Sequence, residues 1–436
     1  MRKTGTVFSC LLLLVALATA VSWHQVEGQS FDSRGDVVAQ TSSAQTEAPT
    51  GFDDQPNGLV EPSLHEEDRA DFDEVELIPD GLGPIYNAQS CRECHQNPTS
   101  GAISQVTELR VGHTDRFGRF LNPSIPIDHG NVVITGRSLV NDRAICPNPE
   151  FPEVQAQQRV PPGANVRTFR TSLNTLGDGF VEAISSSTIL RLAAEQCRRT
   201  NGVICGQPVL VPVLEAGGRL RIGRFGWKAQ HASLLSFSAD AYLNEMGITS
   251  ELLPEEVTTL CDTVADPEDQ PEDGIRGIDR FARFMRASKA PPRDDILARS
   301  LDAQIGSDLF DRIGCDTCHV PTLVTAPAGS IINAGAFTVP PALGDKVIHP
   351  YSDFLLHNVD TGDGIVQNGG QNTANKLRTP PLWGVRTRTR LLHDGSALTL
   401  NEAVLRHGSE ARLAIRNYRA LTDRERQQIL TFLRSL

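Results

Sequence analysis

The chain lacks a second long apolar run, an excess of positive charge and a short-period repeat. After its N-terminal apolar segment, no stretch approaches the roughly 20 apolar residues that a membrane-spanning helix needs, so we expect no span in the mature chain. The formal net charge is −12. This charge argues against nucleic acid or an anionic membrane surface as a partner.

Residues 1–20 are typical of a secretory signal peptide. Arg2 and Lys3 precede an apolar run over residues 7–17, and a small-residue triplet follows at 18–20. The run is short for a bilayer span, although an uncleaved N-terminal anchor is the alternative. We therefore expect an exported protein with a periplasmic location.

Residues 21–78 have the composition of a flexible acidic leader. Between Asp53 and Asp80 there are eleven acidic residues and one basic residue, Arg69, after a tract rich in Ser, Thr, Gln and Ala. Such a segment cannot bury enough apolar surface to order itself. Solvated chain is one interpretation, and a docking segment for a basic electron donor is the other.

The most informative pattern is Cys-x-x-Cys-His, which occurs at residues 91–95 and again at 315–319. Two thiols at this spacing can both reach the vinyl groups of one haem, and the adjacent imidazole then lies beneath the iron. A zinc site would need four thiolate or imidazole ligands close together. A thioredoxin-like pair would not need the histidine twice. We therefore expect two covalently bound haem c groups. The cofactor-binding residues are expected to be Cys91, Cys94, Cys315 and Cys318, and the iron ligands His95 and His319.

Four further cysteines remain outside the signal and the two motifs. Cys197 and Cys205 could close a short loop, which would leave Cys146 with Cys261. An even number suits an oxidising compartment, where haem c is also attached. The sequence leaves the pairing open.

Two domains are expected, and one motif opens each of them. An apolar helical pattern breaks at Pro291-Pro292, which separates an N-terminal haem domain at residues 79–290 from a C-terminal cytochrome c-like haem domain at 291–436. Apolar residues at a spacing of four over 301–313 predict a helix that leads into Cys315.

Strand signals are confined to the N-terminal domain. Residues 209–214 and 219–222 flank a Gly-containing hairpin signal, and residues 132–139 are a further strand candidate. The predicted fold class is therefore mainly α, with two cytochrome c-like haem domains and small β insertions in the N-terminal one.

Several side chains are candidates for the haem environments. His407 and His113 are possible further iron ligands, and methionine has few candidates because only Met246 and Met285 follow Met1. Arg378 suits a haem propionate because a guanidinium matches a carboxylate. For each of these residues an ordinary surface or core role is the alternative.

Eight further segments recur in the order and spacing of a known family. They are Gly-Pro-Ile-Tyr (83–86), Gly-Phe-Val-Glu-Ala-Ile (179–184), Gly-Arg-Phe-Gly-Trp-Lys-Ala (223–229), Met-Gly-Ile-Thr-Ser (246–250), Tyr-Ser-Asp-Phe-Leu-Leu-His (351–357), Arg-Thr-Pro-Pro-Leu-Trp-Gly (378–384), Leu-His-Asp-Gly (392–395), and Glu-Ala-Val with the later His-Gly (402–408). Over residues 81–436 the chain resembles the di-haem oxidoreductase family of peroxidase-like proteins, also called thiol oxidoreductase-like.

The resemblance implies that the two haems have different ligands and different roles. The family is similar to bacterial cytochrome c peroxidases and to the di-haem enzyme that matures tryptophan tryptophylquinone, where Met or Tyr is the sixth ligand of the second haem. The matching position here is His407, which implies a bis-His second haem of lower potential than a His/Met haem would have. The first haem would be reactive, with His95 proximal and either an empty distal side or a displaceable His113.

Two more residues are assigned to the reactive site. Glu182 is the candidate acid–base group for moving a proton between peroxide oxygens, with an exposed helix charge as the alternative. Trp227 is the candidate aromatic bridge between the haems, with ordinary core packing as the alternative.

The expected function is that of a periplasmic, peroxidase-like di-haem oxidoreductase. Electrons from a small redox protein or other donor would pass from the C-terminal haem to the N-terminal haem, where peroxide or an unknown small substrate reacts. The alternative is a non-catalytic electron-transfer cytochrome. A redox or gas sensor ranks last because no output domain is evident. The relatives also bind Ca²⁺ between domains, for which Asp360 and Asp363 are candidates.

Overall fold

The structure is a computed structural model that describes residues 36–40, 44–264, 266 and 274–436. These residues belong to one compact unit, Phe31–Leu436. The predicted signal peptide at residues 1–20 lies outside the described part. Among the described residues no helix combines the length and apolar character needed to cross a bilayer.

The expectation of a mainly α fold is wrong. The structure is 32% helical and 17% strand, and its strands form many small sheets. The chain contains 36 Gly and 27 Pro, and these residues interrupt helices and favour turns between short strands. The α-helices are α1 (Pro62–Asp73), α2 (Cys91–Cys94), α3 (Asp178–Glu182), α4 (Ser186–Arg199), α5 (Leu234–Ala241), α6 (Gly277–Ala287), α7 (Asp295–Ala298), α8 (Leu301–Ile313), α9 (Leu400–Leu405), α10 (Arg412–Ala420) and α11 (Asp423–Arg434).

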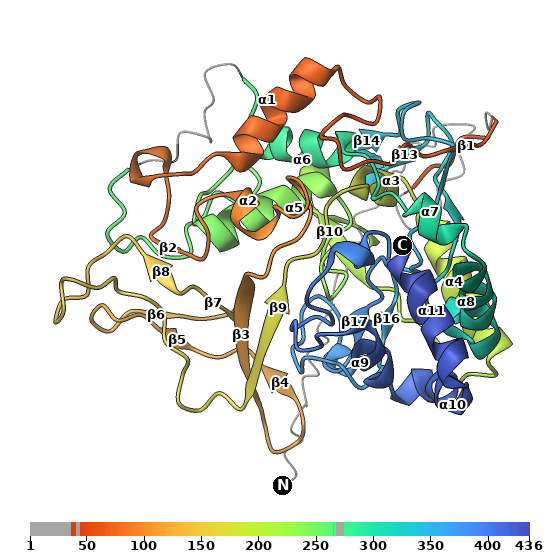
Figure 1. Cartoon of the computed structure of the whole chain (residues 1–436). Coiled ribbons are helices and arrows are strands. Elements are labelled where there is room, and N and C mark those ends of the chain that lie inside the picture. Colours follow the sequence, from red (N-terminus) through yellow and green to blue (C-terminus); the bar gives the residue numbers. More distant parts are fainter. Residues whose placement is uncertain (1–35, 41–43, 265, 267–273) are drawn as a thin grey trace, which may run out of the picture. The chain divides into compact units, whose positions relative to one another are not determined.

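The largest sheet lies between the first motif and α3. It has four strands, in which β3 pairs with β4, β7 and β9, and Figure 1 shows β3 and β9 as its longest members. Leu109 and Val111 are two residues apart on β3, so they lie on the same face of the strand, and both pack into one apolar cluster. The strands of this region are β2 (Ile85–Tyr86), β3 (Thr107–Thr114), β4 (Phe120–Leu121), β5 (Ile125–Pro126), β6 (Val133–Ile134), β7 (Leu139–Val140), β8 (Arg143–Ala144) and β9 (Val166–Thr171).

Short strand pairs connect the rest of the chain. The predicted hairpin at residues 209–222 is confirmed as the antiparallel pair β10 and β11. A three-stranded sheet joins β1, near the N-terminus, to β15 and β12. The strands are β1 (Thr46–Glu47), β10 (Leu210–Val213), β11 (Arg219–Ile222), β12 (Leu323–Val324), β13 (Ile331–Ile332), β14 (Phe337–Thr338), β15 (Lys346–Ile348), β16 (Leu356–His357) and β17 (Leu377–Arg378).

The second half of the predicted leader is ordered, so a flexible leader is wrong for residues 44–78. Helix α1 packs along α6, and the ring of Phe72 lies 4.7 Å from that of Phe284. Asp68 is buried and forms a 2.6 Å ion pair with Arg283. Arginines of α6 neutralise acidic residues of α1. The order of this segment therefore depends on residues outside it and does not follow from its own composition.

The C-terminal helices form a separate apolar cluster around Phe310 and Phe432. The predicted helix into the second motif is confirmed as α8, which lies against α11 in Figure 1. A Cβ atom at Gly306 would collide with the backbone of Gln428, so glycine permits this close crossing. Helix α8 ends at Gly314, whose φ of 96° is left-handed and turns the chain into Cys315.

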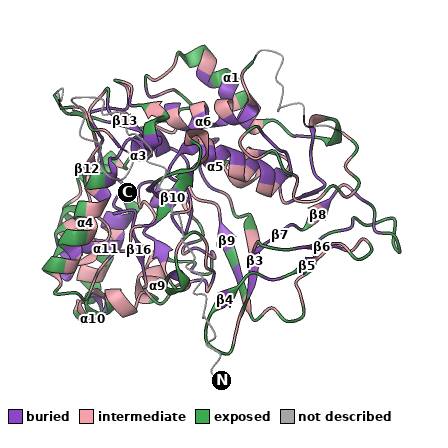
Figure 2. Ribbon diagram, turned by 180° about the vertical axis from the view of Figure 1, so that it is seen from behind, coloured by how far each residue is buried: buried purple, intermediate pink, exposed green. Residues whose placement is uncertain are grey.

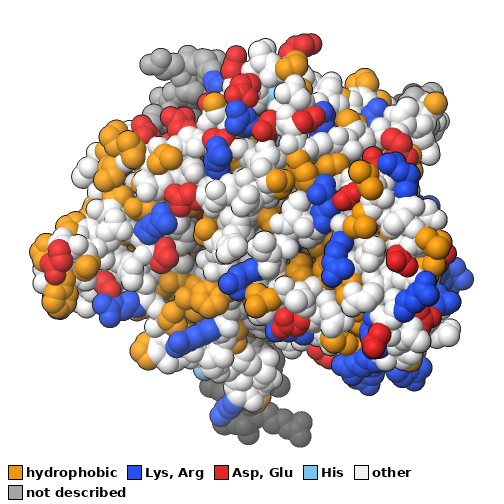
Figure 3. Space-filling model, in the orientation of Figure 1, with side chains coloured by type: hydrophobic (Ala, Val, Ile, Leu, Met, Phe, Trp, Pro, Cys, Tyr) orange, Lys and Arg blue, Asp and Glu red, His pale blue; other side chains and the backbone are white. Residues whose placement is uncertain are grey.

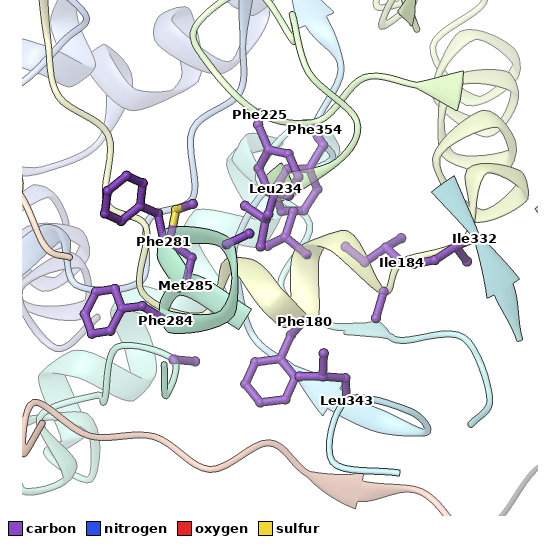
Figure 4. Packing of buried hydrophobic residues seen from close by; sticks show 14 of the residues in the cluster. Phe180, Ile184, Phe225, Leu234, Phe281, Phe284, Met285, Ile332, Leu343 and Phe354 are labelled. Carbon is purple, nitrogen blue, oxygen red and sulfur yellow. The ribbon is translucent and has the colours of Figure 1, made fainter. Parts of the chain in front are cut away.

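The main core draws on both predicted domains. Figure 2 shows buried segments around α3, α5 and α6. In Figure 4, Phe180 and Phe281 belong to the same packed cluster as Leu343 and Phe354. The predicted boundary near residue 290 therefore does not separate two cores. The assignment of two domains stays a prediction.

On the face that Figure 3 shows, the acidic side chains do not form one patch, although the chain carries a net negative charge. Acidic and basic side chains are interspersed there among apolar ones. Ion pairs between α1 and α6, such as Asp71 with Arg280, account for part of the acidic residues.

Candidate functional site

The first motif lies on α2 beside an apolar cavity. Ser90 caps this helix by accepting a hydrogen bond from the Glu93 amide at 3.2 Å. Cys91 and Cys94 are three residues apart, so one helical turn brings their thiols to the same side. Neither forms a disulfide. The cavity holds about 590 Å³ of space unfilled by protein and has an apolar lining of Phe72, Ala88, Phe237, Ala241, Tyr242, Met246, Phe281 and Met285.

His95 is held as a neutral imidazole at this cavity. The carbonyl oxygen of Ala102 lies 3.1 Å from Nδ1. A proton on Nδ1 satisfies that carbonyl and leaves the lone pair on Nε2 for a metal. Burial lowers the pKa of His95, which favours the neutral form that a metal requires.

The second motif borders a larger cavity, with about 1350 Å³ of space unfilled by protein. Cys315 follows α8 directly, and a 3₁₀ turn over Cys315–Thr317 leads to Cys318 and His319. Both thiols are outside the disulfides. The apolar lining is Ile204, Phe310, Leu377, Leu382, Val385, Leu391, Leu392, Leu400, Val404, Ile415 and Leu433.

Four imidazoles line this second cavity, those of His319, His357, His393 and His407. His357 is ion-paired with Asp353 and Glu410, whereas His319 and His407 resemble His95 in their hydrogen bonding. His319 Nδ1 lies 3.0 Å from the carbonyl oxygen of Tyr351, and His407 Nδ1 lies 2.8 Å from that of Ala403. Each ring therefore has its Nε2 available in the same tautomer as His95. Burial and the neighbouring His407 lower the pKa of His319 to about 4, so both rings are neutral near pH 7.

Two arginines complete the polar lining of the second cavity. Arg378 is only 4% exposed, and its Nε donates to the carbonyl of Gly226 at 2.7 Å. Burial lowers the pKa values of Arg378 and Arg388 to about 10. A buried guanidinium without a matched carboxylate suits a propionate group. The thiols, imidazoles and apolar walls therefore fit a haem at each motif, and the two guanidinium groups add partners for propionates at the second.

Three residues predicted for the reactive site do not meet at the first cavity. His113 is exposed on β3, where its Nδ1 lies 3.0 Å from the carbonyl oxygen of Gly163. Trp227 lines the second cavity, and its Nε1 donates to the carbonyl of Thr171 at 2.8 Å. Glu182 lines neither cavity.

Glu182 belongs to a buried ionic group instead. Its carboxylate accepts hydrogen bonds from Arg286 Nε at 2.7 Å, from the Leu234 amide at 2.8 Å and from Asn333 Nδ2 at 2.9 Å. Burial raises its pKa, but Arg286 and these donors outweigh burial and lower it overall. This arrangement joins α3 to α5 and α6, and it places the carboxylate in the core, away from the lining of either cavity.

A carboxylic acid that was not predicted from the sequence, Glu245, does line the first cavity. It accepts a hydrogen bond from Asn87 Nδ2 at 2.9 Å. Burial and the charge of Glu108 raise the pKa of Glu245 to about 8. A signal was available, because Glu245 directly precedes the Met-Gly-Ile-Thr-Ser segment that carries part of the family resemblance.

The two calcium candidates differ in burial and in their partners. Asp360 is exposed, whereas Asp363 is buried and forms ion pairs with Arg170 at 2.6 Å and Lys228 at 2.8 Å. The ammonium of Lys228 also donates to three backbone carbonyls in residues 373–376. Protein cations thus occupy the oxygens of Asp363, and Ca²⁺ binding stays a prediction.

The remaining cysteines pair as the short-loop interpretation predicts. Cys197 is bonded to Cys205, and Cys146 to Cys261. With two disulfides and two motif cavities, the fold and the sites define a protein built to hold two haems.

Comparison with known proteins assigns the chain to a family. A sequence profile described as "Di-haem oxidoreductase, putative peroxidase" matches residues 164–436, more than half of the chain. The chain therefore belongs to this family of di-haem oxidoreductases. The matched region contains the second motif and His407, and the first motif precedes it.

Weaker similarities are found among solved structures. The Kuenenia stuttgartiensis hydrazine synthase is 13% identical, with a TM-score of 0.37 and coverage of 92% of this chain and 99% of that chain. A MauG-like protein associated with microbial copper homeostasis is 17% identical, with a TM-score of 0.29 and coverage of 60% and 89%. No curated protein matches the sequence significantly.

Proposed function

We propose that the protein is a periplasmic, peroxidase-like oxidoreductase with two covalently attached haem c groups. Cys315 and Cys318 would hold the haem that accepts electrons from a small redox protein. Cys91 and Cys94 would hold the haem that receives these electrons and at which peroxide or another small substrate would react. The observation that carries this proposal is the difference between the cavities. At the second, His319 and His407 are both held through Nδ1 with Nε2 available for a metal, whereas the first has one imidazole, His95, and a carboxylic acid, Glu245.

The location is supported by the redox state of the chain's cysteines. The disulfides Cys146–Cys261 and Cys197–Cys205 need an oxidising compartment. Haem c attachment needs an export route as well, and the predicted signal at residues 1–20 agrees with both.

The residues divide into those that hold each haem and those that act on the substrate. A bound haem supplies electron-transfer chemistry and, at an open coordination position, activation of peroxide. His319 and His407 would both ligate the second haem, and an iron with two imidazole ligands suits electron transfer. His95 would ligate the first haem, where reaction with peroxide needs a coordination position that no protein side chain fills.

Glu245 is the group that supplies protons at the first site. Reduction of hydrogen peroxide to two waters consumes two electrons and two protons, so the electrons from the redox partner need an equal number of protons. A carboxylic acid with a pKa near 8 still carries its proton at pH 7. Glu245 can therefore donate to the leaving oxygen, and the adjoining Asn87 amide orients its carboxyl group.

Passage of electrons between the sites is supported by the position of Trp383. A small cavity is lined by Trp383, Ala102 and Arg388. Ala102 is the hydrogen-bond partner of His95, and Arg388 also lines the second cavity. Trp227, the bridge candidate from the sequence, lines the second cavity alone.

One observation favours the alternative of a pure electron-transfer cytochrome. Met246 and Met285 both line the first cavity, and a thioether that bound the iron would complete a His/Met haem. This state would carry electrons and would not react with peroxide unless the thioether were displaced.

Optical and paramagnetic-resonance titration of the holoprotein separates the two functions. Peroxide is added at each oxidation level, and the spin state of the first haem is followed. A high-spin signal that peroxide removes, together with loss of peroxide reduction in Glu245→Gln, supports the oxidoreductase. Two low-spin haems that ignore peroxide at every level refute it, and recovery of a high-spin signal in Met246→Leu or Met285→Leu then identifies the thioether ligand.

A further inference from the structure

Helix α10 forms part of the wall between the second cavity and solvent. Ala411, which directly precedes the helix, lines the cavity together with Ala414 and Ile415, and Tyr418 is fully buried one turn further on. These positions recur at the spacing of one helix face. On this side the cavity is therefore separated from solvent by a single helix, which is about 10 Å across.

The opposite face of α10 is basic. Arg412, Arg416 and Arg419 are exposed at positions i, i+4 and i+7, and the helix contains no acidic residue. Leu413, next to Arg412, is 53% exposed. Basic side chains lie side by side at the lower right of Figure 3, where Figure 1 places α10. The outside of the second cavity thus carries positive charge, although the formal net charge of the chain is −12.

The fold does not account for these three arginines. Within the described part of the chain they form no ion pair, whereas Arg283 and Arg286 of α6 each pair with a buried carboxylate. Like charges at the spacing of Arg412 and Arg416 disfavour a helix. Arg412 is also the first residue of α10, where the helix dipole disfavours a cation. A partner of opposite charge would account for them.

Two other charged surfaces fit a partner of one charge less well. Asp308 and Asp311 are exposed on α8, but Arg312 is exposed beside them, so this face carries both signs. The acidic residues of α1 include Asp68 and Asp71, which form ion pairs with arginines of α6. The expectation that the acidic leader docks a basic electron donor therefore gains no support from these two residues.

We propose that the exposed face of α10 is the docking surface for a small acidic redox protein that delivers electrons to the second haem. This inference rests on the proposed function and specifies the chemistry of its electron donor. Each transfer oxidises the donor by one electron and reduces the ferric iron of the second haem by one. Carboxylates of the donor would pair with the guanidinium groups, and an apolar side chain would cover Leu413.

Electron exchange with two oxidants tests this surface without peroxide. The reduced holoprotein is mixed in a stopped-flow instrument with oxidised plastocyanin, an acidic copper protein, or with the cation tris(phenanthroline)cobalt(III). Each oxidant accepts one electron, and oxidation of the haems is followed at several ionic strengths. Arg412→Glu and Arg416→Glu reverse charges on α10. Arg116→Glu is the matched control, because Arg116 is exposed on the β3–β4 turn and lines neither cavity.

The expected effects have opposite signs for the two oxidants. The wild-type rate constant with plastocyanin should fall as ionic strength rises, and each reversal on α10 should lower it roughly tenfold or more at low ionic strength. The cobalt complex should react faster with these variants than with the wild type. Arg116→Glu should stay within about twofold of the wild type, because distant exposed charges are screened. Arg412→Gln and Arg416→Gln should show smaller losses with plastocyanin, and they decide the question if the reversed variants do not fold.

The net charge of the chain supplies the opposite expectation. If the charge of −12 governed the encounter, repulsion would make the plastocyanin rate constant rise with ionic strength. This dependence overturns the inference, as do equal rate constants in the wild type and the α10 variants. Binding of the wild type but not of Arg416→Glu to phosphatidylglycerol vesicles also overturns it, because the face would then serve an anionic lipid surface.

The measurement separates this inference from the proposed function. Electron exchange with plastocyanin needs no turnover of peroxide. If the α10 variants behave as expected and the protein reduces no peroxide, the docking surface stands and the peroxidase-like function fails. If the protein reduces peroxide and the α10 variants exchange electrons like the wild type, the function stands and the docking surface is refuted.

Discussion

Replacement of Glu182 by alanine tests whether this residue serves stability or catalysis. The side chain is fully buried, and it links three structural neighbours: Arg286, the Leu234 amide and Asn333. Its loss leaves the Arg286 guanidinium without its ionic partner and two donors without an acceptor. We therefore predict that Glu182→Ala lowers the free energy of unfolding and leaves the catalytic rate of the folded protein unchanged.

The expected loss is about 3–5 kcal/mol in the free energy of unfolding. This is the usual cost of removing one partner of a buried ion pair, because the remaining charge stays desolvated. Arg286 retains a cation–π contact with Phe337, at 4.3 Å from the ring centroid, which places the expected value toward the lower end. Glu182→Gln keeps the volume and loses the charge, so it is expected to cost less.

Denaturant unfolding of the holoprotein measures the change, and an exposed ion pair is the control. Asp53→Ala breaks the 2.8 Å pair with Lys289, in which Asp53 is largely exposed, and is expected to cost about 0–1 kcal/mol. The folded fraction of Glu182→Ala should reduce peroxide at the wild-type rate. Wild-type stability together with a tenfold or larger loss of rate would refute this reasoning and restore Glu182 as an acid–base group.

Three further outcomes are expected. His407→Ala should change the absorption and paramagnetic-resonance spectra of the second haem alone, and an unchanged spectrum rejects the ligand. Joint replacement of Cys146 and Cys261 by serine opens a bridge that spans 115 residues, which should cost about 5 kcal/mol in denaturant unfolding; a cost below about 1 kcal/mol contradicts the chain-entropy explanation. Burial raises the pKa of Asp363, but Arg170 and Lys228 lower it overall. The stabilisation that Asp363 contributes is therefore fully present above about pH 4, the ordinary pKa of an aspartate, and is lost as the pH falls through the lower pKa of the folded state. In Asp363→Asn the free energy of unfolding should lack this part of its dependence on pH.

Local features were predictable because each depends on residues close together in the chain. The helix into the second motif became α8, and the Gly-containing segment became the β10–β11 hairpin. The short spacing of Cys197 and Cys205 indicated their pairing, which left Cys146 with Cys261. The fold class was wrong because the many short strand pairs have too few residues to produce a periodic signal.

Features that join distant segments were not predictable. The composition of residues 44–78 suggested disorder, but the arginines that neutralise α1 lie on α6. His113 was a ligand candidate from its distance to His95 along the chain, but β3 carries it to an exposed position. Glu182 had the right residue type in a family segment, but its charge is used by Arg286 in the core.

By itself, the sequence determined the chemistry of attachment: two pairs of thiols, each followed by an imidazole, at a spacing set by the covalent geometry of the backbone. The tertiary structure decided what stands opposite each imidazole. It brings His407 to the cavity of His319, and it brings Glu245, from a π-turn remote in sequence, to the wall of the cavity of His95. The physical reason is that proton affinity depends on burial and on neighbouring charges, and both exist only after the chain has folded.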